Sequence, residues 1–108
     1  MKISENVLEI LGDTPLVRLD RFFPGRATLA VKLEYFNPGG SLKDRAVMSM
    51  IRRAEEEGRL KRGGTLVEAT SGNTGYAVAM LAAARGYKAI IVCSDKVAPE
   101  KVATLQAY

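Results

Sequence analysis

Apolar and polar positions alternate in two different periods along this chain. Runs with strand character, rich in β-branched residues or apolar throughout, predict strands over residues 28–35, 65–69 and 88–93. Segments of helical character follow each strand and predict helices over residues 42–57, 76–84 and 99–108. Strand and helix in regular alternation predict an α/β fold, with an open, mostly parallel sheet and helices on both faces in three layers.

Local signals mark where these elements begin and end. Gly58 and Gly86 are expected to terminate the first two helices, and Pro99 suits the first position of the third. The helix over residues 76–84 is apolar on every side, so we expect it to be covered by several neighbours. Before the first long strand, turn signals at residues 12–15 and 24–25 flank a short extended run over residues 16–19.

Composition bounds the possible chemistry. The 108 residues are 47% hydrophobic and 26% charged, which predicts one globular core rather than a complete two-domain enzyme. The chain has no histidine and a single cysteine, Cys93, which excludes His-based catalytic sets and disfavours a zinc site. We expect Cys93 to be a buried strand residue. No apolar run is long enough to span a bilayer and the first residues lack a secretory profile, so a cytoplasmic protein is expected.

A net charge of +4 and a pI near 9.4 raise the question of nucleic acid. The basic residues concentrate in the segment 52–62, where they alternate with three consecutive glutamates, as on a solvated helix end. No aromatic side chain that could stack on a base lies within this segment. The charge pattern therefore predicts that the protein does not bind nucleic acid.

A turn over residues 37–41 runs directly into the first helix and brings a lysine to its start. Ser41 occupies an N-cap position, and Asp44 three residues later makes an acidic variant of a capping box. Helical spacing places Lys43 at the head of an apolar stripe that continues through positions 47, 50, 51 and 54, and places Arg45 on the solvated face. Such a lysine either extends to water or is held close to neutral for chemistry.

A second polar loop, over residues 70–75, follows the next strand and opens the next helix. It carries hydroxyl groups, an amide and backbone N–H groups where an anion could bind, although Thr70 or Ser71 could equally serve as a helix cap. If both loops leave the carboxyl ends of parallel strands, they lie close together. The segment 72–75 also matches the four-residue loop of the KH RNA-binding module, a short match that leaves a binding module as an alternative.

Three segments of the sequence together resemble one enzyme family. Residues 11–19 (LGDTPLVRL), 37–45 (NPGGSLKDR) and 68–75 (EATSGNTG) are similar, in order and spacing, to motifs of the cysteine synthase and cystathionine β-synthase family. The resemblance covers the whole chain as the N-terminal portion of such an enzyme. Leu42 and Asp13 depart mildly from the family pattern, where valine and asparagine are common.

The resemblance implies pyridoxal 5'-phosphate as cofactor, the fold called type II among these enzymes, and a role for each motif residue. Lys43 would bond the cofactor aldehyde and act as general base, and Asn73 would bind the ring hydroxyl of the cofactor. The carboxylate of an amino-acid substrate would be held by one loop, made of Thr70, Ser71, Gly72, Asn73 and Thr74.

The implied activity is cysteine synthesis from O-acetylserine and sulfide, with release of acetate, through an aminoacrylate intermediate. Cystathionine synthesis from serine and homocysteine is the alternative, and Asp13 leans slightly toward it. A non-catalytic binding module or an inert folding fragment are more remote alternatives. The family also implies a homodimer and a possible complex with serine acetyltransferase.

Family members are longer than this chain, which predicts a fragment with one incomplete α/β unit over residues 1–108. Residues 1–36 would join the larger domain of the enzyme, and residues 37–108 would form part of the smaller mobile domain. The glycine-rich loop that binds the cofactor phosphate, and the partner of the pyridine nitrogen, are expected in the remainder.

Overall fold

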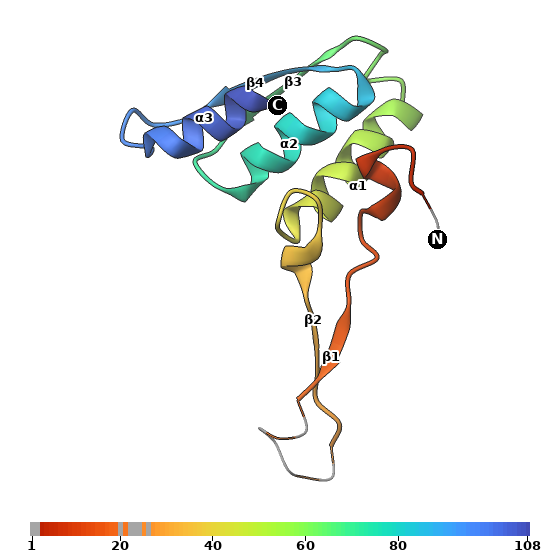
Figure 1. Ribbon diagram of the computed structural model, residues 1–108. Helices are drawn as coiled ribbons and strands as arrows, with labels where there is room; N and C mark the ends of the chain where they lie inside the picture. Colours follow the sequence, from red (N-terminus) through yellow and green to blue (C-terminus); the bar gives the residue numbers. More distant parts are fainter. Residues whose placement is uncertain (1–2, 20, 22–24, 26) are drawn as a thin grey trace.

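The computed structural model describes residues 3–19, 21, 25 and 27–108 of the chain (Figure 1). In chain order, the elements of the N-terminal part are η1 (Val7–Ile10), β1 (Leu16–Arg18), β2 (Ala30–Lys32) and η2 (Glu34–Phe36). Those of the remainder are α1 (Lys43–Glu56), β3 (Thr65–Ala69), α2 (Asn73–Arg85), β4 (Lys88–Val92) and α3 (Pro99–Ala107). The expected turn at Pro24 lies outside the described residues.

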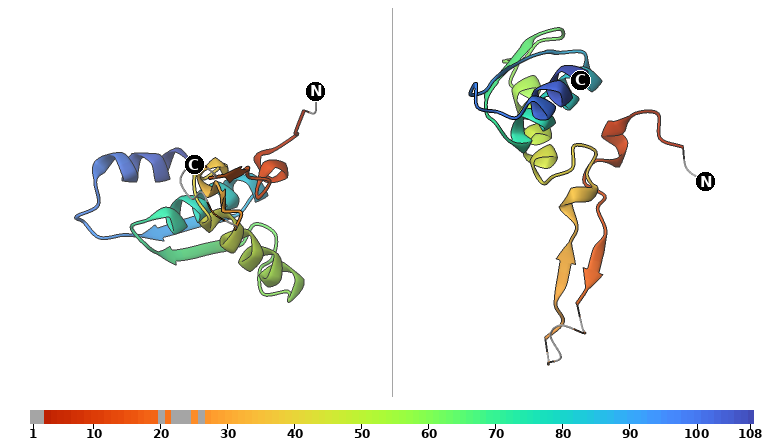
Figure 2. Two further views of the ribbon diagram at one scale, coloured as in Figure 1. Left: turned by 90° about the horizontal axis from the view of Figure 1, so that it is seen from below. Right: turned by 60° about the vertical axis from the view of Figure 1, so that its left-hand side comes forward.

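β3 and β4 form a parallel pair, with Val67 opposite Ile90 in the register. α2 and α3 lie on one side of this pair, and the views of Figures 1 and 2 agree on this arrangement. Leu66 and Ile91 point toward the helices and pack against the core. The α/β class is therefore confirmed, and the strands are linked through α2 as the alternation predicted.

The opposite face of the parallel pair is uncovered by the described residues. Val67 of β3 lies on this face together with Ile90 and Val92 of β4, and each of the three is more than half exposed. The expectation of helices on both faces is thus met on one face only within this part of the chain. Apolar side chains on both faces of a strand are typical of a sheet buried on both sides, which is the pattern that predicted three layers.

α2 is the centre of the core. It contacts α1, α3, both parallel strands and η1, and its residues from Ala77 to Ala82 are all buried. A helix that is apolar on every side needs neighbours on every side, so the sequence predicted this position correctly. Gly86 ends the helix with a φ of +74°, in the left-handed region that glycine adopts without strain.

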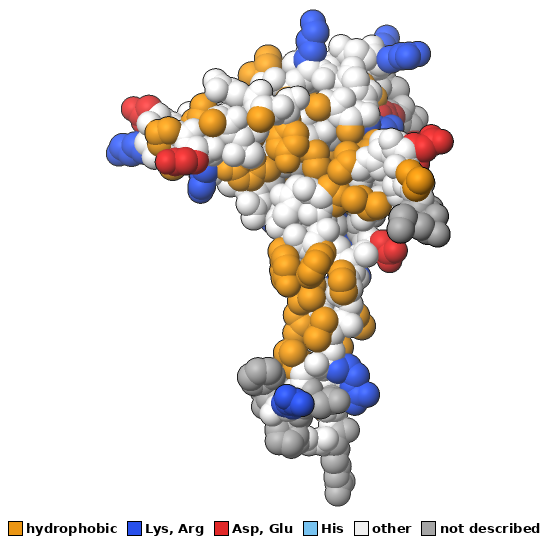
Figure 3. All heavy atoms as spheres, viewed as in Figure 1, with side chains coloured by type: hydrophobic (Ala, Val, Ile, Leu, Met, Phe, Trp, Pro, Cys, Tyr) orange, Lys and Arg blue, Asp and Glu red, His pale blue; other side chains and the backbone are white. Residues whose placement is uncertain are grey.

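The strand predicted over residues 28–35 differs from expectation. Only Ala30–Lys32 is extended as β2, and it pairs in antiparallel fashion with β1 rather than with the parallel strands. The two strands form a hairpin that projects from the helical body, by which we mean α1, α2, α3 and the parallel pair of strands (Figure 1). The hairpin exposes apolar side chains (Figure 3). An alternating pattern specifies a strand but not its partner, because pairing depends on residues distant in the chain.

Cys93 is exposed, which corrects the expectation of a buried strand residue. β4 ends at Val92, so Cys93 begins the loop toward α3 instead of continuing the strand.

No helix in the described part of the chain combines the length and apolar character needed to cross a bilayer.

Candidate functional site

The turn before α1 is held by short-range hydrogen bonds. Gly40, with a φ of +77°, donates its N–H to the carbonyl oxygen of Asn37 at 2.8 Å. The hydroxyl of Ser41 accepts the N–H of Lys43 at 3.1 Å and satisfies one of the free donors at the start of the helix. Lys43 is the first residue of α1, and Leu42 occupies the N-cap position without a side-chain cap. The N-cap predicted at Ser41 is therefore displaced by one residue, although the Ser41 hydroxyl still accepts the first helical N–H.

The buried stripe of α1 is rotated by one residue from the prediction. Asp44 is fully buried, and the stripe continues through Val47, Met48 and Ile51, whereas Lys43 is exposed. The expectation that Lys43 heads the apolar stripe, and is partly desolvated there, is therefore wrong for the described residues. Hydrophobicity alone favoured the stripe that runs through Met50, a residue that the structure leaves 58% exposed.

Asp44 lies inside because its carboxylate has a backbone partner within the turn. Its Oδ2 accepts the N–H of Gly39 at 2.5 Å, while Oδ1 is buried without a partner among the described residues. Burial raises the pKa of this carboxyl above its ordinary value, and the Gly39 hydrogen bond opposes that rise. The expected capping box, in which Asp44 would reach back to Ser41, is replaced by this longer connection to Gly39.

Arg45 is half-buried and joins three segments, which corrects its assignment to the solvated face. Its guanidinium donates to the carbonyl oxygen of Gly12 at 2.6 Å, to the hydroxyl of Thr14 at 3.2 Å and to the carboxylate of Glu34 at 2.8 Å. The hydrogen bond from Arg45 lowers the pKa of Glu34. The buried side chain of Asn37 adds a second connection, since its oxygen accepts the N–H of Gly12 at 2.9 Å.

The second predicted loop connects β3 directly to α2. The hydroxyl of Thr70 accepts the N–H of Gly72 at 3.2 Å, and Gly72 is the residue before the helix. Ser71, Gly72 and Asn73 are exposed, and Thr74 is half-buried. Thr70 therefore shapes the loop rather than capping the helix, and no side-chain cap occupies the first donors of α2.

The two loops lie at the same end of the helical body, for a different reason than the one predicted. The strand before the lysine turn belongs to the hairpin, so the turn does not leave the parallel sheet. Instead α1 packs along α2, and Figures 1 and 2 show the two helices running in the same general direction. Lys43 and Asn73 are the first residues of these helices, so they lie at the N-terminal ends of two helices that pack side by side.

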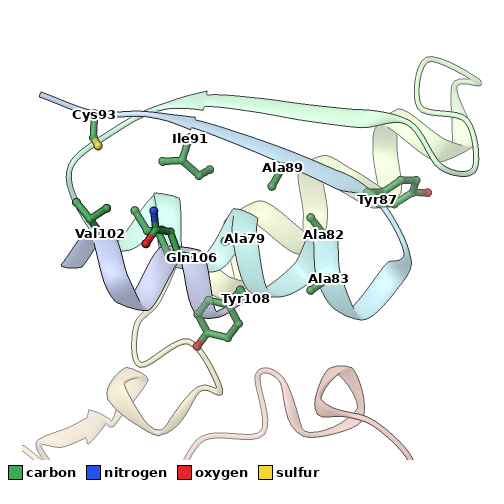
Figure 4. A pocket seen from close by; sticks show the side chains of 11 residues that line it. Ala79, Ala82, Ala83, Tyr87, Ala89, Ile91, Cys93, Val102, Gln106 and Tyr108 are labelled. Carbon is green, nitrogen blue, oxygen red and sulfur yellow. The ribbon is translucent and has the colours of Figure 1, made fainter. Parts of the chain in front are cut away.

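A groove of about 440 Å³ lies elsewhere, between α2, β4 and α3 (Figure 4). Small side chains such as Ala79 and Ala82 line its floor, and Cys93 and Tyr108 line two of its sides. None of the motif residues named above lines this groove. Apart from the series of alanines in α2, no sequence motif indicates this groove.

Comparison with known proteins assigns the chain to a family. Residues 7–108 match the profile of the family described as pyridoxal-phosphate dependent enzyme. The chain belongs to this family. A probable cysteine synthase of Bacillus subtilis (strain 168) is 53% identical over 109 residues, covering all of this chain and 35% of that protein.

Two solved structures share the fold. A crystal structure of O-ureido-L-serine synthase has a TM-score of 0.88 and 47% identity, over 99% of this chain and 34% of the other. An O-acetylserine dependent cystathionine β-synthase from Helicobacter pylori has a TM-score of 0.85 and 33% identity, over 99% of this chain and 36% of the other. The resemblance to fold type II enzymes is thereby confirmed. The chain spans about a third of the length of the relatives it matches.

The residues present suit the aldehyde end of pyridoxal phosphate, the cofactor of this family. Schiff-base chemistry needs a primary amine, and the Lys43 amine makes no hydrogen bond or ion pair with the described residues. Near the matching end of α2, the amide of Asn73 and the uncapped first-turn N–H groups are donors for anionic or phenolic oxygen atoms. Among the described residues, no cluster of His, Cys, Asp and Glu could hold a metal ion.

Proposed function

We propose that the polypeptide carrying this chain is a cysteine synthase that converts O-acetylserine and sulfide to cysteine and acetate. The observation that supports this most directly is the placement of Lys43 and of the loop before α2 at matching ends of two packed helices. The 53% identity to a probable cysteine synthase supports the same reaction class. Pyridoxal phosphate, when bound, supplies an aldehyde that takes up amines and a ring that accepts electron density.

Lys43 is the proposed nucleophile and proton carrier. Its Nζ would hold the cofactor at the aldehyde, and the free amine would serve as the base that removes the proton from Cα of the substrate. The Cβ–O bond then breaks and acetate leaves with the electron pair. Sulfide adds its sulfur to Cβ, and Lys43 returns the proton to Cα, which completes cysteine.

The loop before α2 is the proposed binding site for the substrate carboxylate. Ser71, Gly72 and Asn73 are exposed at the positive end of the helix dipole, where backbone N–H groups favour an anion. Thr70 and Thr74 would add hydroxyl donors, and the amide of Asn73 would also reach the cofactor ring hydroxyl. The loop thus orients the amino acid while Lys43 acts on its Cα.

The role of Lys43 is tested by absorbance after pyridoxal phosphate is added to the complete natural polypeptide that carries these residues. We expect a near-ultraviolet or visible band in the wild type, its loss in Lys43→Ala, and its persistence in Lys96→Ala, a control on an exposed loop residue. Cysteine formation should fall in Lys43→Ala by at least about a thousandfold. An equal band and equal turnover in Lys43→Ala would contradict the proposal.

Cystathionine synthesis is the second candidate activity, and the similarity to the Helicobacter pylori enzyme favours keeping it. Product formation from O-acetylserine and from serine, each supplied in turn with sulfide and with homocysteine, separates the two. A faster reaction with homocysteine would assign the second activity. The remote alternative of an RNA-binding module is disfavoured, because the segment 72–75 follows a strand, whereas the KH loop joins two helices.

Assembly and location complete the proposal. A homodimer, a complex with serine acetyltransferase, and a cytoplasmic location follow from the family likeness. The division at residue 36 between a larger and a smaller domain likewise stays a prediction. The projecting hairpin supports such a division, because it makes its strand pairing apart from the parallel strands.

A further inference from the structure

The residue after Lys43 has an environment that the proposed chemistry does not explain. Asp44 is 0% exposed, and its Oδ1 has no hydrogen-bond partner among the described residues. Burying a carboxylate with an unpaired oxygen costs free energy that a neutral or apolar side chain would avoid. A carboxyl group kept in such a position indicates a requirement that packing alone does not impose.

The partner of Asp44 identifies that requirement. Its Oδ2 accepts the N–H of Gly39, five residues earlier, so the side chain closes a loop that contains Lys43. The fit leaves no room at Gly39, where an added Cβ would lie 2.4 Å from Asp44 Oδ1 and 2.9 Å from Asp44 Cγ. The carboxylate therefore contacts the backbone of the turn directly, and a residue with a side chain at position 39 would displace it.

The enclosed turn needs a tether of this kind. Gly39 and Gly40 are consecutive glycines, and Gly40 has a φ of +77°, so the unbound segment has unusual conformational freedom. The Ser41 hydroxyl holds only the N–H of Lys43, and Asn37 holds the Gly40 N–H and the Ser41 carbonyl oxygen. The Gly39 N–H is the donor in this turn that depends on Asp44.

We propose that Asp44 is a positioning residue, whose buried carboxylate tethers the backbone of Gly39 and so fixes the point from which the Lys43 side chain projects. This rests on the proposed role of Lys43 as nucleophile. Displacements of about 1 Å between reacting groups reduce rates by about a hundredfold, so loosening this turn acts on catalysis without removing a reacting group. Asp44 is 0% exposed, so it would act through the turn and not as a reacting group.

The experiment compares Asp44→Ala, Asp44→Asn and Gly39→Ala in the complete natural polypeptide. Asp44→Ala removes the acceptor, Asp44→Asn keeps an oxygen that can accept the Gly39 N–H, and Gly39→Ala displaces the carboxylate. Glu56→Ala, an exposed acidic residue of the same helix, is the matched control. Amide hydrogen exchange at Gly39 and Lys43 is measured together with kcat, KM and the pyridoxal phosphate absorbance band.

In Asp44→Ala and Gly39→Ala, we expect the backbone amide at position 39 to exchange at least about tenfold faster than in the wild type, after correction for the intrinsic exchange rate of the residue there. We expect kcat to fall by about ten- to a hundredfold in both variants. KM for the amino acid should change less than about threefold, because the proposed carboxylate loop belongs to α2. Asp44→Asn should keep most of the wild-type protection of the Gly39 amide and most of the wild-type kcat. Glu56→Ala should match the wild type in every measurement.

Two results would contradict the proposal that Asp44 positions Lys43 by holding Gly39. One is unchanged Gly39 exchange in Asp44→Ala, and the other is a kcat within about twofold of wild type in a variant whose exchange has increased. Should Asp44→Ala fail to fold, Gly39→Ala and Asp44→Asn carry the same comparison. A wild type without a Lys43-dependent band would refute the proposed function instead, while the exchange measurement would still decide whether Asp44 holds the turn.

Discussion

At the scale of the residue, Gly75 shows how tightly the loop before α2 is packed. It lies in the first turn of the helix and is buried. A Cβ at this position would lie 2.9 Å from Cγ2 of Thr70 and 3.3 Å from Cγ2 of Ile91. The close approach of loop, helix and strand at this point therefore depends on the absence of a side chain.

Gly75→Ala should destabilise the protein by about 1 kcal/mol. Alanine is the better helix former by up to about 1 kcal/mol, but overpacking in a filled site costs about 1–3 kcal/mol. Urea unfolding monitored by circular dichroism measures the net effect. Adding Thr70→Ser removes the nearest methyl group, so the loss in the double variant should be smaller than the sum of the two single losses. Strict additivity would show that the contact is not the cause.

At the scale of the element, a polar cluster holds the C-terminal ends of α1 and α2 together at the start of β4. The carboxylate of Glu55 accepts hydrogen bonds from the guanidinium of Arg85 and from the hydroxyl of Tyr87. Both members of the ion pair are about three-quarters buried, at 23% and 27% exposure. The Arg85 hydrogen bond, followed by that of Tyr87, lowers the pKa of Glu55.

Glu55→Gln should lower the free energy of unfolding at pH 7 by about 1 kcal/mol, because a partly exposed pair is weakened by solvent. The pKa of Glu55 is lower in the folded state, so its stabilisation is present above the ordinary glutamate value and is lost as the pH falls through the folded-state pKa. The variant should therefore lose less stability than the wild type between pH 5 and the acid transition. Urea unfolding across this pH range measures the free energy of unfolding, with the exposed Glu56→Gln as control. Parallel pH profiles for Glu55→Gln and the wild type would contradict the prediction.

At the scale of the whole molecule, the hairpin and the helical body are two parts joined through a few polar side chains. β1 and β2 pair with each other and not with β3 or β4, and the hairpin extends away from the helices (Figure 2). Arg45 donates from α1 to the segment before β1 and to η2 after β2, so one guanidinium holds both ends of the hairpin.

Arg45→Lys should loosen the hairpin without unfolding the helical body. Lysine keeps the charge but lacks the fork that reaches Gly12, Thr14 and Glu34 together. We expect amide exchange in β1 and β2 to become several-fold faster, with little change in α2, as measured by hydrogen exchange and mass spectrometry. Arg52→Lys, on the exposed side of α1, is the control. Unchanged exchange in the hairpin would show that other contacts hold it.

The sequence by itself determined the features that depend on a few neighbouring residues. The stop at Gly86 and the start at Pro99 were predicted correctly, because glycine conformation and proline geometry act within one turn of chain. The position of α2 at the centre also followed from the sequence, because an all-apolar helix has no face suited to water. The three motifs were sufficient to indicate the family.

Only the tertiary structure decided which partners these elements take. It placed β2 beside β1, brought Asp44 rather than Lys43 into the interior, and connected Arg45 to residues more than thirty positions away. Hydrophobic periodicity ranks the faces of a helix by apolar content, but it contains no information on a buried carboxylate that meets a backbone N–H. Strand pairing and polar networks are selected by the free energy of contacts between distant segments, and those contacts exist only in the folded chain.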